Sequence, residues 1–176
     1  MNRRHFLGLA LSTAAAPVLA AKHNHTQRRV LALHNLHTNE SIEVAYRIGD
    51  YYQRDALRKL NRFLRDYRTD DIAVIDPKLF DLLYDLQRRA KSSDGEFEIY
   101  SGYRSPKTNA MLRRHSKRVA KHSLHMSGKA IDLRLCGCSI SNIRDTAVAM
   151  GRGGVGYYPR SNFVHVDTGP FRTWRA

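Results

Sequence analysis

Alternating apolar and polar residues mark several short segments as half-buried strands, because successive side chains of a strand point to opposite faces. The segments 29–36 (RVLALHNL) and 41–48 (SIEVAYRI) both alternate, and the polar residues HTNE between them predict a hairpin. A third segment, 96–105 (EFEIYSGYRS), predicts a strand that runs into a turn at Gly102.

Two further alternating segments carry chemically active side chains on a polar face. In 129–135 (KAIDLRL), Asp132 lies on the face opposite to one isoleucine and two leucines. In 163–169 (FVHVDTG), His165 and Asp167 share one face and two valines occupy the other. We expect the valines to pack inward on helices, which leaves His165 and Asp167 facing a cleft.

Four segments are predicted as helices, namely 49–68, 77–90, 106–115 and 139–150. In the second of these, Asp76 is a suitable N-cap and Pro77 occupies the first turn. In the fourth, we place the cap near Ser141 or Asn142. The helices precede most of the strands and do not alternate with them, so the order favours an α+β fold.

The stretch SLHMSGKAIDL, residues 123–133, places His125 seven residues before Asp132. A continuous helix would bring the two side chains onto roughly one face, but Ser127 and Gly128 between them favour a loop. We therefore expect a loop carrying His125, a turn at Gly128 and a strand carrying Asp132, so that two ligand-type side chains converge from different elements.

A glycine-rich stretch, GRGGVGYYP, precedes the last predicted strand. Glycine lets the backbone approach a ligand closely, so Gly153, Gly154 and Gly156 can border a peptide groove lined by the following tyrosines. The alternative is a tight turn before the strand. Phe171 and Trp174, near the end of the chain, are expected to cover one end of the core.

The first residues resemble an export signal and not part of the folded domain. A basic start is followed by a short apolar run and small residues ending near Ala21. Arg3 and Arg4 indicate the twin-arginine type, which exports folded proteins. The alternative is a membrane anchor, against which the shortness of the apolar run and Pro17 both count. The prediction is a signal at 1–21, a flexible segment at 22–28 and a single domain at 29–176, with no transmembrane span in the mature chain.

The chain is strongly basic, with a formal net charge of +14 at pH 7. Removing residues 1–21 removes two arginines and no acidic residue, which lowers this charge to +12. An exported protein of this charge is expected to meet anionic partners such as cell-wall peptides, anionic lipid or polysaccharide. Nucleic acid is not expected as a partner, because the sequence contains no recognised nucleic-acid module. Part of the charge can also serve only to solvate helices.

The two cysteines, Cys136 and Cys138, are separated by a single residue. An exported protein can oxidise such a pair, but the ring that a bridge would close is tight and strained. Two thiols alone do not make a zinc site. A local structural role is therefore favoured over a metal-binding role.

Together, His125, Asp132 and His165 supply two imidazoles and one carboxylate from a loop and two strands. This set, with an open fourth position, is a known catalytic zinc set. Zinc lowers the pKa of bound water and polarises a carbonyl, which suits amide hydrolysis. The alternative is that both histidines are hydrogen-bonded core residues.

Four ordered blocks of sequence resemble a known family. The pattern S-x-H-x-x-G-x-A-x-D at residues 123–132, together with SGYRS at 101–105, resembles the LAS group of zinc D-Ala-D-Ala peptidases. The wider match adds GGVGYYP and FVHVDTGPFRTW, covers roughly residues 96–174, and is similar to the exported murein endopeptidases of the MepK type.

The resemblance implies a hedgehog/D-Ala-D-Ala peptidase-like α+β fold with a small antiparallel sheet and helices packed on one side. It also implies zinc held by His125, Asp132 and His165, with Arg104 reaching the scissile carbonyl or its oxyanion.

One position departs from the pattern of the family. Several relatives place an acidic residue or a histidine three positions before the last ligand as general base, and this chain has Asn162 there. Asn162 cannot take a proton, so we consider Asp167 as the first candidate for the base and His122 as the second. The alternative for Asp167 is a carboxylate that orients the metal-bound imidazole of His165.

The predicted function is zinc-dependent hydrolysis of stem-peptide cross-links in peptidoglycan, in the periplasm or at the cell surface. Three alternatives stay open. They are a D-alanyl-D-alanine carboxypeptidase, a non-catalytic wall-binding module stabilised by zinc, and a polyanion binder whose affinity falls steeply with salt.

Overall fold

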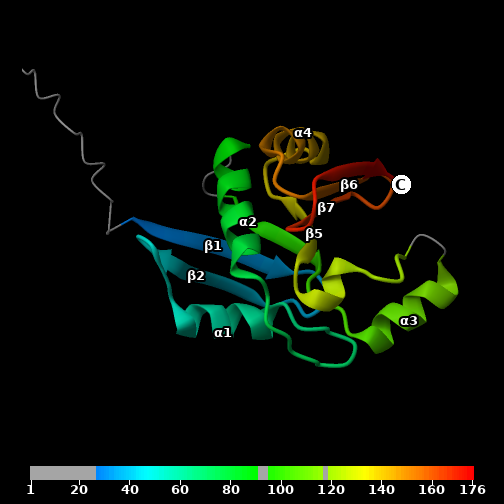
Figure 1. Cartoon of the computed structure of the whole chain (residues 1–176). Coiled ribbons are helices and arrows are strands. Elements are labelled where there is room, and N and C mark those ends of the chain that lie inside the picture. The colour runs from blue at the N-terminus through cyan, green and yellow to red at the C-terminus, as the bar shows by residue number, and fades with distance from the viewer. Residues whose placement is uncertain (1–26, 91–94, 117–118) are drawn as a thin grey trace, which may run out of the picture.

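The computed structural model describes residues 27–90, 95–116 and 119–176, and its strands form a single sheet (Figure 1). These strands are β1 (Arg28–Asn35), β2 (Ser41–Ile48), β3 (Tyr51–Tyr52), β4 (Phe97–Ser101), β5 (Ala130–Leu135), β6 (Gly154–Tyr158), β7 (Phe163–Asp167) and β8 (Arg172–Arg175). Their order across the sheet is β3-β2-β1-β4-β5-β7-β6-β8.

The sheet is larger than predicted and is mixed. Its eight strands pair antiparallel except for β1 with β4 and β6 with β8, which are parallel. The α+β class is confirmed, but the prediction of a small antiparallel sheet is wrong. Two helices separate β1 from β4 along the chain, and such a long connection allows parallel pairing. After β7, the chain reverses and β8 joins the free edge of β6.

Three of the four predicted helices lie close to their expected positions. The helices are α1 (Arg54–Phe63), α2 (Pro77–Arg89), α3 (Pro106–His115) and α4 (Ile140–Met150), and a 3₁₀ turn, η1, spans Leu124–Ser127. The helix predicted over 49–68 is too long, because Tyr51–Tyr52 form β3 and the helix spans only Arg54–Phe63. Asp76 caps α2 as predicted, because its side chain accepts a hydrogen bond from the Lys78 amide. The cap predicted for α4 is wrong, since Ser139 holds that position and accepts from the Asn142 amide.

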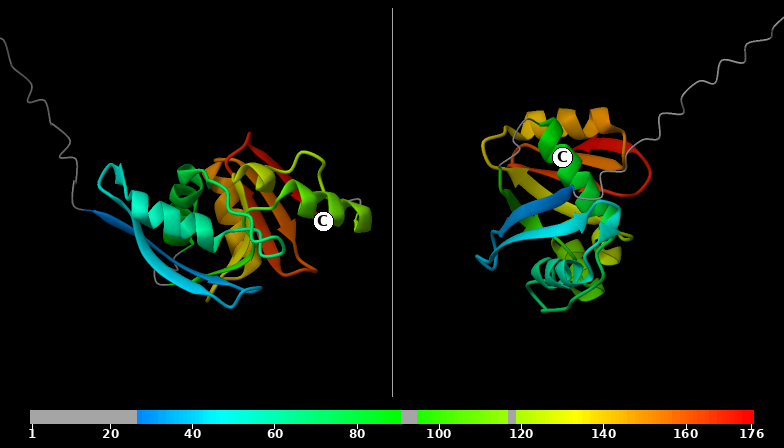
Figure 2. Two further views of the ribbon diagram at one scale, coloured as in Figure 1. Left: turned by 90° about the horizontal axis from the view of Figure 1, so that it is seen from below. Right: turned by 90° about the vertical axis from the view of Figure 1, so that its left-hand side faces the viewer.

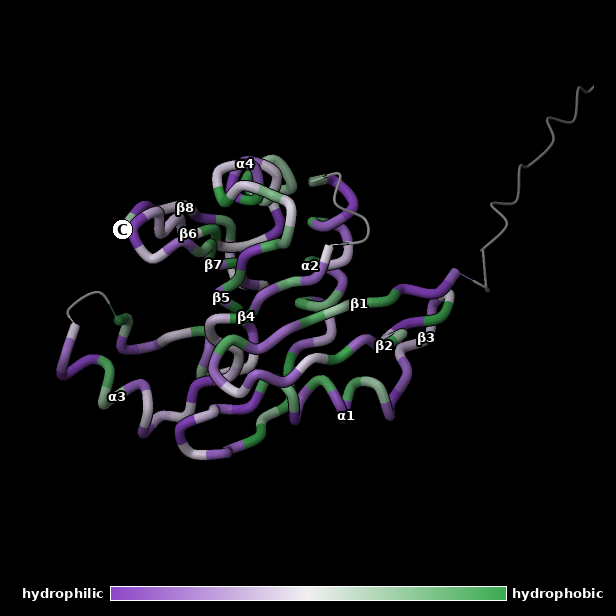
Figure 3. The backbone as a smooth tube through the Cα atoms, turned by 180° about the vertical axis from the view of Figure 1, so that it is seen from behind, coloured by the Kyte–Doolittle hydropathy of each residue, from purple (hydrophilic) through white to green (hydrophobic). Residues whose placement is uncertain are grey.

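One hydrophobic cluster lies between the sheet and the helices α1, α2 and α4. Leu33, Ile99, Leu133 and Val164 come from four different strands and are fully buried in it. Figure 2 shows α2 and α4 on the sheet from two further directions, and the tube in Figure 3 alternates between apolar and polar along α1. The predicted inward faces of β5 and β7 are confirmed, so their polar residues lie on the opposite face.

The first strand begins slightly before the predicted domain. β1 includes Arg28, which belongs to the predicted flexible segment 22–28. The signal predicted at residues 1–21 lies outside the described residues. Within the described residues, no helix combines the length and the apolar character needed to cross a membrane.

Candidate metal centre and active site

Asp132 and His165 are brought together by the pairing of two strands. They are direct partners in the antiparallel register of β5 and β7, and both point away from the hydrophobic core. His125 comes from η1, which ends at Gly128 in a left-handed conformation (φ 65°). A Cβ at Gly128 would lie 2.3 Å from the carbonyl oxygen of Val74, so only glycine fits this turn without a shift of the backbone.

The three side chains converge on one point. His125 Nε2 lies 3.3 Å from Asp132 Oδ1 and 3.2 Å from His165 Nδ1, and His165 Nδ1 lies 2.8 Å from Asp132 Oδ1. All three residues are buried. Within the described part of the chain, these three residues are the group of His, Cys, Asp or Glu side chains whose ligand atoms lie close enough together to share one metal ion.

The outer nitrogen of each imidazole is held by a second partner. His125 Nδ1 lies 2.8 Å from the carbonyl oxygen of Gly102, and His165 Nε2 lies 3.0 Å from Asp167 Oδ2. Each outer nitrogen therefore carries a proton, which it donates to an oxygen. A metal ion requires the neutral form of each ring, in which the inner nitrogen is bare; two lone pairs and a carboxylate oxygen would then face one another.

This donor set fits a metal ion. A tetrahedral site with metal–ligand distances of about 2.0–2.1 Å has ligand atoms roughly 3.3 Å apart. The separations among His125, Asp132 and His165 are 2.8–3.3 Å. Hydrogen-bonded outer nitrogens are also typical of metal-binding histidines. The donor types, the distances between them and the orientation of the two rings are thus all those expected of a metal site.

Electrostatics at the cluster also favour a cation. Burial would raise the pKa of Asp132, but His125 and His165 outweigh this effect and hold it well below its ordinary value. Burial would lower the pKa of His165, but hydrogen bonds to Asp132 and Asp167 raise it to about 9. For His125, burial prevails and lowers the pKa. The negative electrostatic potential that raises the pKa of His165 would also stabilise a bound metal cation.

Arg104 lies beside the cluster at the end of β4. Its side chain is largely buried, with Nη2 3.7 Å from Asp132 Oδ2 and 3.4 Å from Ser101 Oγ. The loop that carries it is fixed by hydrogen bonds from the Tyr103 amide to the Leu64 carbonyl and from the Arg104 amide to the His125 carbonyl. Neither side-chain contact is short, so the guanidinium retains capacity to bind a further acceptor.

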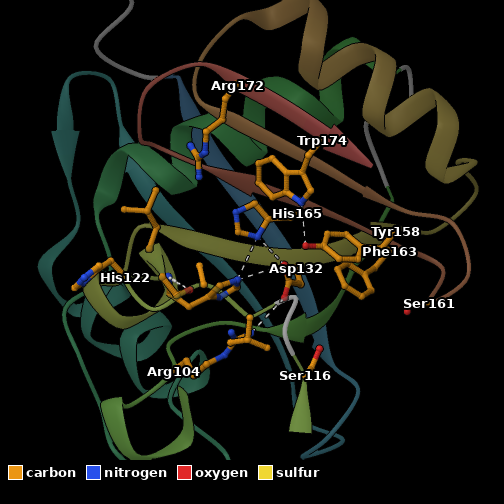
Figure 4. A pocket seen from close by; sticks show the side chains of 15 residues that line it. Arg104, Ser116, His122, Asp132, Tyr158, Ser161, Phe163, His165, Arg172 and Trp174 are labelled. Carbon is orange, nitrogen blue, oxygen red and sulfur yellow. Dashed lines mark hydrogen bonds and ion pairs between the residues drawn. The ribbon is translucent and has the colours of Figure 1, made fainter. Parts of the chain in front are cut away.

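A pocket of about 520 Å³ opens above the cluster (Figure 4). Arg104, Asp132 and His165 lie on one side of it, and Tyr158, Phe163 and Trp174 form an aromatic wall. His122 also lines the pocket but is exposed, and its ring points away from the cluster in Figure 4. The pocket therefore has a cationic wall and an aromatic wall, and three potential metal ligands line it.

Comparison with known proteins places the chain in a family. Residues 23–174 match the family model described as "Peptidoglycan L,D-endopeptidase MepK". The chain belongs to this family. The protein of that name from Escherichia coli (strain K12) is 50% identical, with 98% of this chain and 97% of the relative aligned. The probable peptidoglycan L,D-endopeptidase MepK of Haemophilus influenzae is 40% identical, over 99% of this chain and 96% of the relative.

Within this member of the MepK family, Asp167 lies behind His165 and not beside the pocket. Asp167 is fully buried and contacts the outer nitrogen of His165, on the side away from the cluster. Its carboxylate also accepts hydrogen bonds from the Gly154 and Gly169 amides and from Arg172. Burial would raise the pKa of Asp167, but these partners lower it. This placement favours the orienting role over the role of general base.

Among the pocket residues that were not identified from the sequence are Arg172, which contacts Asp167, and Trp174, which contacts the His165 ring. Arg172 and Trp174 stand on β8, and β8 reaches the site only because it pairs with β6. The expectation that Trp174 covers one end of the core is wrong, because its ring lies 5.1 Å from the His165 ring on the site face. The only signal in the sequence was their proximity to FVHVDTG within one block.

The glycine-rich stretch contains β6, a strand that its sequence pattern does not predict. Gly154 and Gly156 make room for neighbouring side chains on the site face. A Cβ at Gly156 would lie 2.5 Å from the Trp174 ring, and a Cβ at Gly154 would lie 2.4 Å from both Arg172 Nη1 and Asp167 Oδ2. Their function is thus close packing beside the pocket.

The two cysteines lie just beyond the other end of β5. Cys136 is exposed, Cys138 is half-buried, and the two are not joined by a disulfide. The Asn142 side-chain amide lies 3.2 Å from Cys138 Sγ. Neither cysteine belongs to the group formed by His125, Asp132 and His165.

Proposed function

We propose that this chain is a zinc-dependent peptidoglycan hydrolase that cleaves L,D peptide bonds in stem-peptide cross-links during remodelling of the cell wall. The observation that carries the proposal is the convergence of His125 Nε2, Asp132 Oδ1 and His165 Nδ1 below a pocket. Membership of a family of peptidoglycan L,D-endopeptidases supports the substrate and the class of bond.

His125, Asp132 and His165 would hold the zinc ion. When bound, zinc supplies Lewis-acid polarisation and makes water a nucleophile near neutral pH. The remaining tasks belong to the protein. It must orient the scissile carbonyl, stabilise the negative charge that develops on its oxygen, remove a proton from the attacking water, and return a proton to the leaving amine.

Arg104 is suited to the developing oxyanion. Its guanidinium is fixed next to Asp132 by a loop with two backbone hydrogen bonds, and most of its side chain is shielded from water. A cation that is already in place and partly desolvated stabilises new negative charge without reorganising. Its planar fork can also hold the carbonyl in one orientation.

His122 is the stronger candidate for the general base. The carboxylate of Asp167 is engaged by His165, two backbone amides and Arg172, and it faces away from the pocket. His122 lines the pocket and is exposed. In the proposed mechanism, the His122 side chain rotates toward the cluster, accepts a proton from the attacking water and then protonates the leaving amine.

The competing functions differ in their products. A D-alanyl-D-alanine carboxypeptidase would release one terminal residue, whereas an endopeptidase separates two joined stems. A non-catalytic wall-binding module would release nothing, and a polyanion binder would not respond to a chelator. Membership of a family of endopeptidases favours separation of joined stems.

We also infer export to the periplasm. A substrate in peptidoglycan lies outside the cytoplasmic membrane, and the basic and apolar pattern of residues 1–21 is that of a signal. Arg3 and Arg4 support the twin-arginine type.

Digestion of purified cross-linked peptidoglycan tests the proposed function. The products are identified by mass, with the enzyme as purified, after chelation, and after zinc is restored. We expect cross-linked dimers to become monomers, and we expect this activity to vanish with chelator and return with zinc. Loss of a single terminal residue would indicate a carboxypeptidase, and unchanged dimers under all conditions would contradict hydrolysis.

A further inference from the structure

Arg172 makes a two-pronged contact with the carboxylate that supports His165. Arg172 Nη1 lies 3.1 Å from Asp167 Oδ1, and Nη2 lies 2.7 Å from Asp167 Oδ2. Asp167 is fully buried, whereas the Arg172 side chain is 45% exposed at the pocket. The Arg172 side chain therefore lies between the buried carboxylate of Asp167 and the solvent.

The two oxygens of Asp167 are held in different ways. Oδ1 accepts hydrogen bonds from the Gly154 and Gly169 amides, both at 2.9 Å. Oδ2 is the oxygen that meets His165 Nε2, at 3.0 Å, and its other hydrogen bond comes from Arg172. The backbone thus anchors one oxygen, and the guanidinium fork fixes the direction of the oxygen that holds the imidazole.

The fold makes space for this contact. β8 pairs with β6 in a parallel register that places Arg172 beside Gly154. Because Gly154 has no Cβ, the guanidinium and the Asp167 carboxylate can meet over it, where a Cβ would lie 2.4 Å from each. The ring of Trp174, 5.1 Å from the guanidinium carbon, lies on the same strand as Arg172.

We propose that Arg172 is a positioning residue of the metal centre. Its fork holds Asp167 so that the carboxylate fixes the His165 ring, with Nδ1 directed at the metal-binding position. Partners of this kind orient metal ligands, and their loss typically weakens metal affinity about 10–100-fold. This inference rests on the zinc dependence in the proposed function, but it concerns metal binding and can be measured without substrate.

A purely structural role for Arg172 makes a different prediction. The Arg172 side chain is 45% exposed but Asp167 is fully buried, so removal of the arginine takes one partner from a buried carboxylate and should lower stability. The contacts of Asp167 with His165 and with the Gly154 and Gly169 amides remain. If the pair only neutralised a buried carboxylate, the charge of lysine would replace it fully. A lysine ammonium cannot engage both carboxylate oxygens in the planar geometry of a guanidinium.

The experiment compares the full-length wild type with Arg172→Gln, Arg172→Lys, Gly154→Ala and the control Arg175→Gln. Arg175 is an exposed cation on the same strand, outside the residues that line the pocket. Each protein is stripped of metal and titrated with zinc against a chromophoric chelator. The visible absorption of the cobalt(II)-substituted proteins then reports the geometry of the ligands.

We expect Arg172→Gln to weaken zinc binding about 10–100-fold and to change the cobalt spectrum. Arg172→Lys should recover only part of the affinity, Gly154→Ala should resemble Arg172→Gln, and Arg175→Gln should match the wild type. Wild-type affinity and spectrum in Arg172→Gln would overturn the proposal. If that variant does not fold, Arg172→Lys decides in the same way, because wild-type affinity there would show that the fork is not needed.

The outcomes also separate this inference from the proposed function. A wild-type protein that binds no zinc would overturn both. Tight zinc binding with no hydrolysis of peptidoglycan would overturn only the proposed function, and the effect of Arg172 on zinc affinity would still be measured.

Discussion

Asp132 and His165 face each other across the pair formed by β5 and β7, with Asp132 Oδ1 2.8 Å from His165 Nδ1. Two of the three proposed ligands are therefore placed by the sheet itself, whose register is set by the buried residues on its other face. The third, His125, belongs to η1 and reaches the site through a short turn. A bound metal ion would join η1 to the sheet.

Replacing His125 with alanine should remove most of the bound zinc. A site with three protein ligands has none to spare, and the same loss is expected for Asp132→Ala and His165→Ala. Elemental analysis of the purified variants measures the metal content. Because metal stabilises the folded state by mass action, chelation should also lower the melting temperature of the wild type. Full zinc content in His125→Ala would contradict the assignment and direct attention to Cys136 and Cys138.

Much of this arrangement can be predicted from the sequence, because it depends on local periodicity. The alternation in KAIDLRL and FVHVDTG gave the faces of Asp132 and His165, and Gly128 indicated the turn after His125. The inward face of each strand is decided by a run of aliphatic residues, which is visible without knowledge of any partner strand.

The parts that were missed depend on contacts between distant segments. β6 has glycines where a strand normally has bulky residues, so its pattern resembles a turn. β8 is a short edge strand with three of its four residues exposed, and nothing local indicates that it pairs with β6. Arg172 and Trp174 enter the site only through this pairing, and for that reason their roles could not be derived from spacing.

Arg104→Lys should lower turnover strongly while zinc is retained. Lysine keeps the charge but lacks the planar fork that would hold the carbonyl and its oxyanion. Removal of one such donor typically costs about 10²–10³-fold in kcat. Turnover and zinc content should be measured together, with Arg113→Lys on the exposed end of α3 as the matched control. Wild-type turnover in Arg104→Lys would mean that the arginine is structural.

Asp66→Asn should destabilise the loop that carries Arg104. The buried carboxylate of Asp66 accepts hydrogen bonds from the Ser105 and Arg68 amides, and Ser105 directly follows Arg104. Leaving a buried donor unsatisfied costs about 1–3 kcal/mol. Urea unfolding at pH 7 measures this loss, and Asp55→Asn, on the exposed surface of α1, serves as the control.

The stabilisation that Asp66 provides should decrease toward acidic pH. Burial would raise its pKa, but hydrogen bonds from Thr108, Ser105 and Arg68 outweigh this effect and lower it. A lowered pKa contributes stability above the unfolded value of about 3.9, and the contribution is lost as the pH falls through the folded value. Acid should therefore reduce the stability difference between wild type and Asp66→Asn. A difference that grows toward low pH would contradict this account.

Replacement of Arg3 and Arg4 by lysines should block export of the folded protein. Twin-arginine signals depend on the arginine pair, whereas the ordinary route for unfolded chains requires only a basic start. Fractionation of cells that express each form measures the exported share. Undiminished accumulation of the double-lysine form outside the cytoplasmic membrane would show that the ordinary route is used.

The last prediction separates the two candidates for the general base. If Asp167 orients His165, Asp167→Asn weakens zinc binding, and much of the lost hydrolysis returns when zinc is raised to saturation. If Asp167 is the base, zinc affinity is unchanged and hydrolysis stays low at every zinc concentration. The contacts of Asp167 with His165, Gly154, Gly169 and Arg172 favour the first outcome.

His122→Ala should show the complementary pattern. We expect unchanged zinc affinity and a loss of hydrolysis of roughly 10²-fold or more, because His122 is exposed at the pocket and does not belong to the ligand group. His115→Ala, at the exposed end of α3 and outside the residues that line the pocket, controls for removal of an imidazole. If His122→Ala retains wild-type turnover while Asp167→Asn is inactive at saturating zinc, the base is Asp167 and the side chain must leave its contacts during catalysis. If both variants retain wild-type turnover, neither residue carries the proton, and the proposed mechanism is wrong even though the metal site stands.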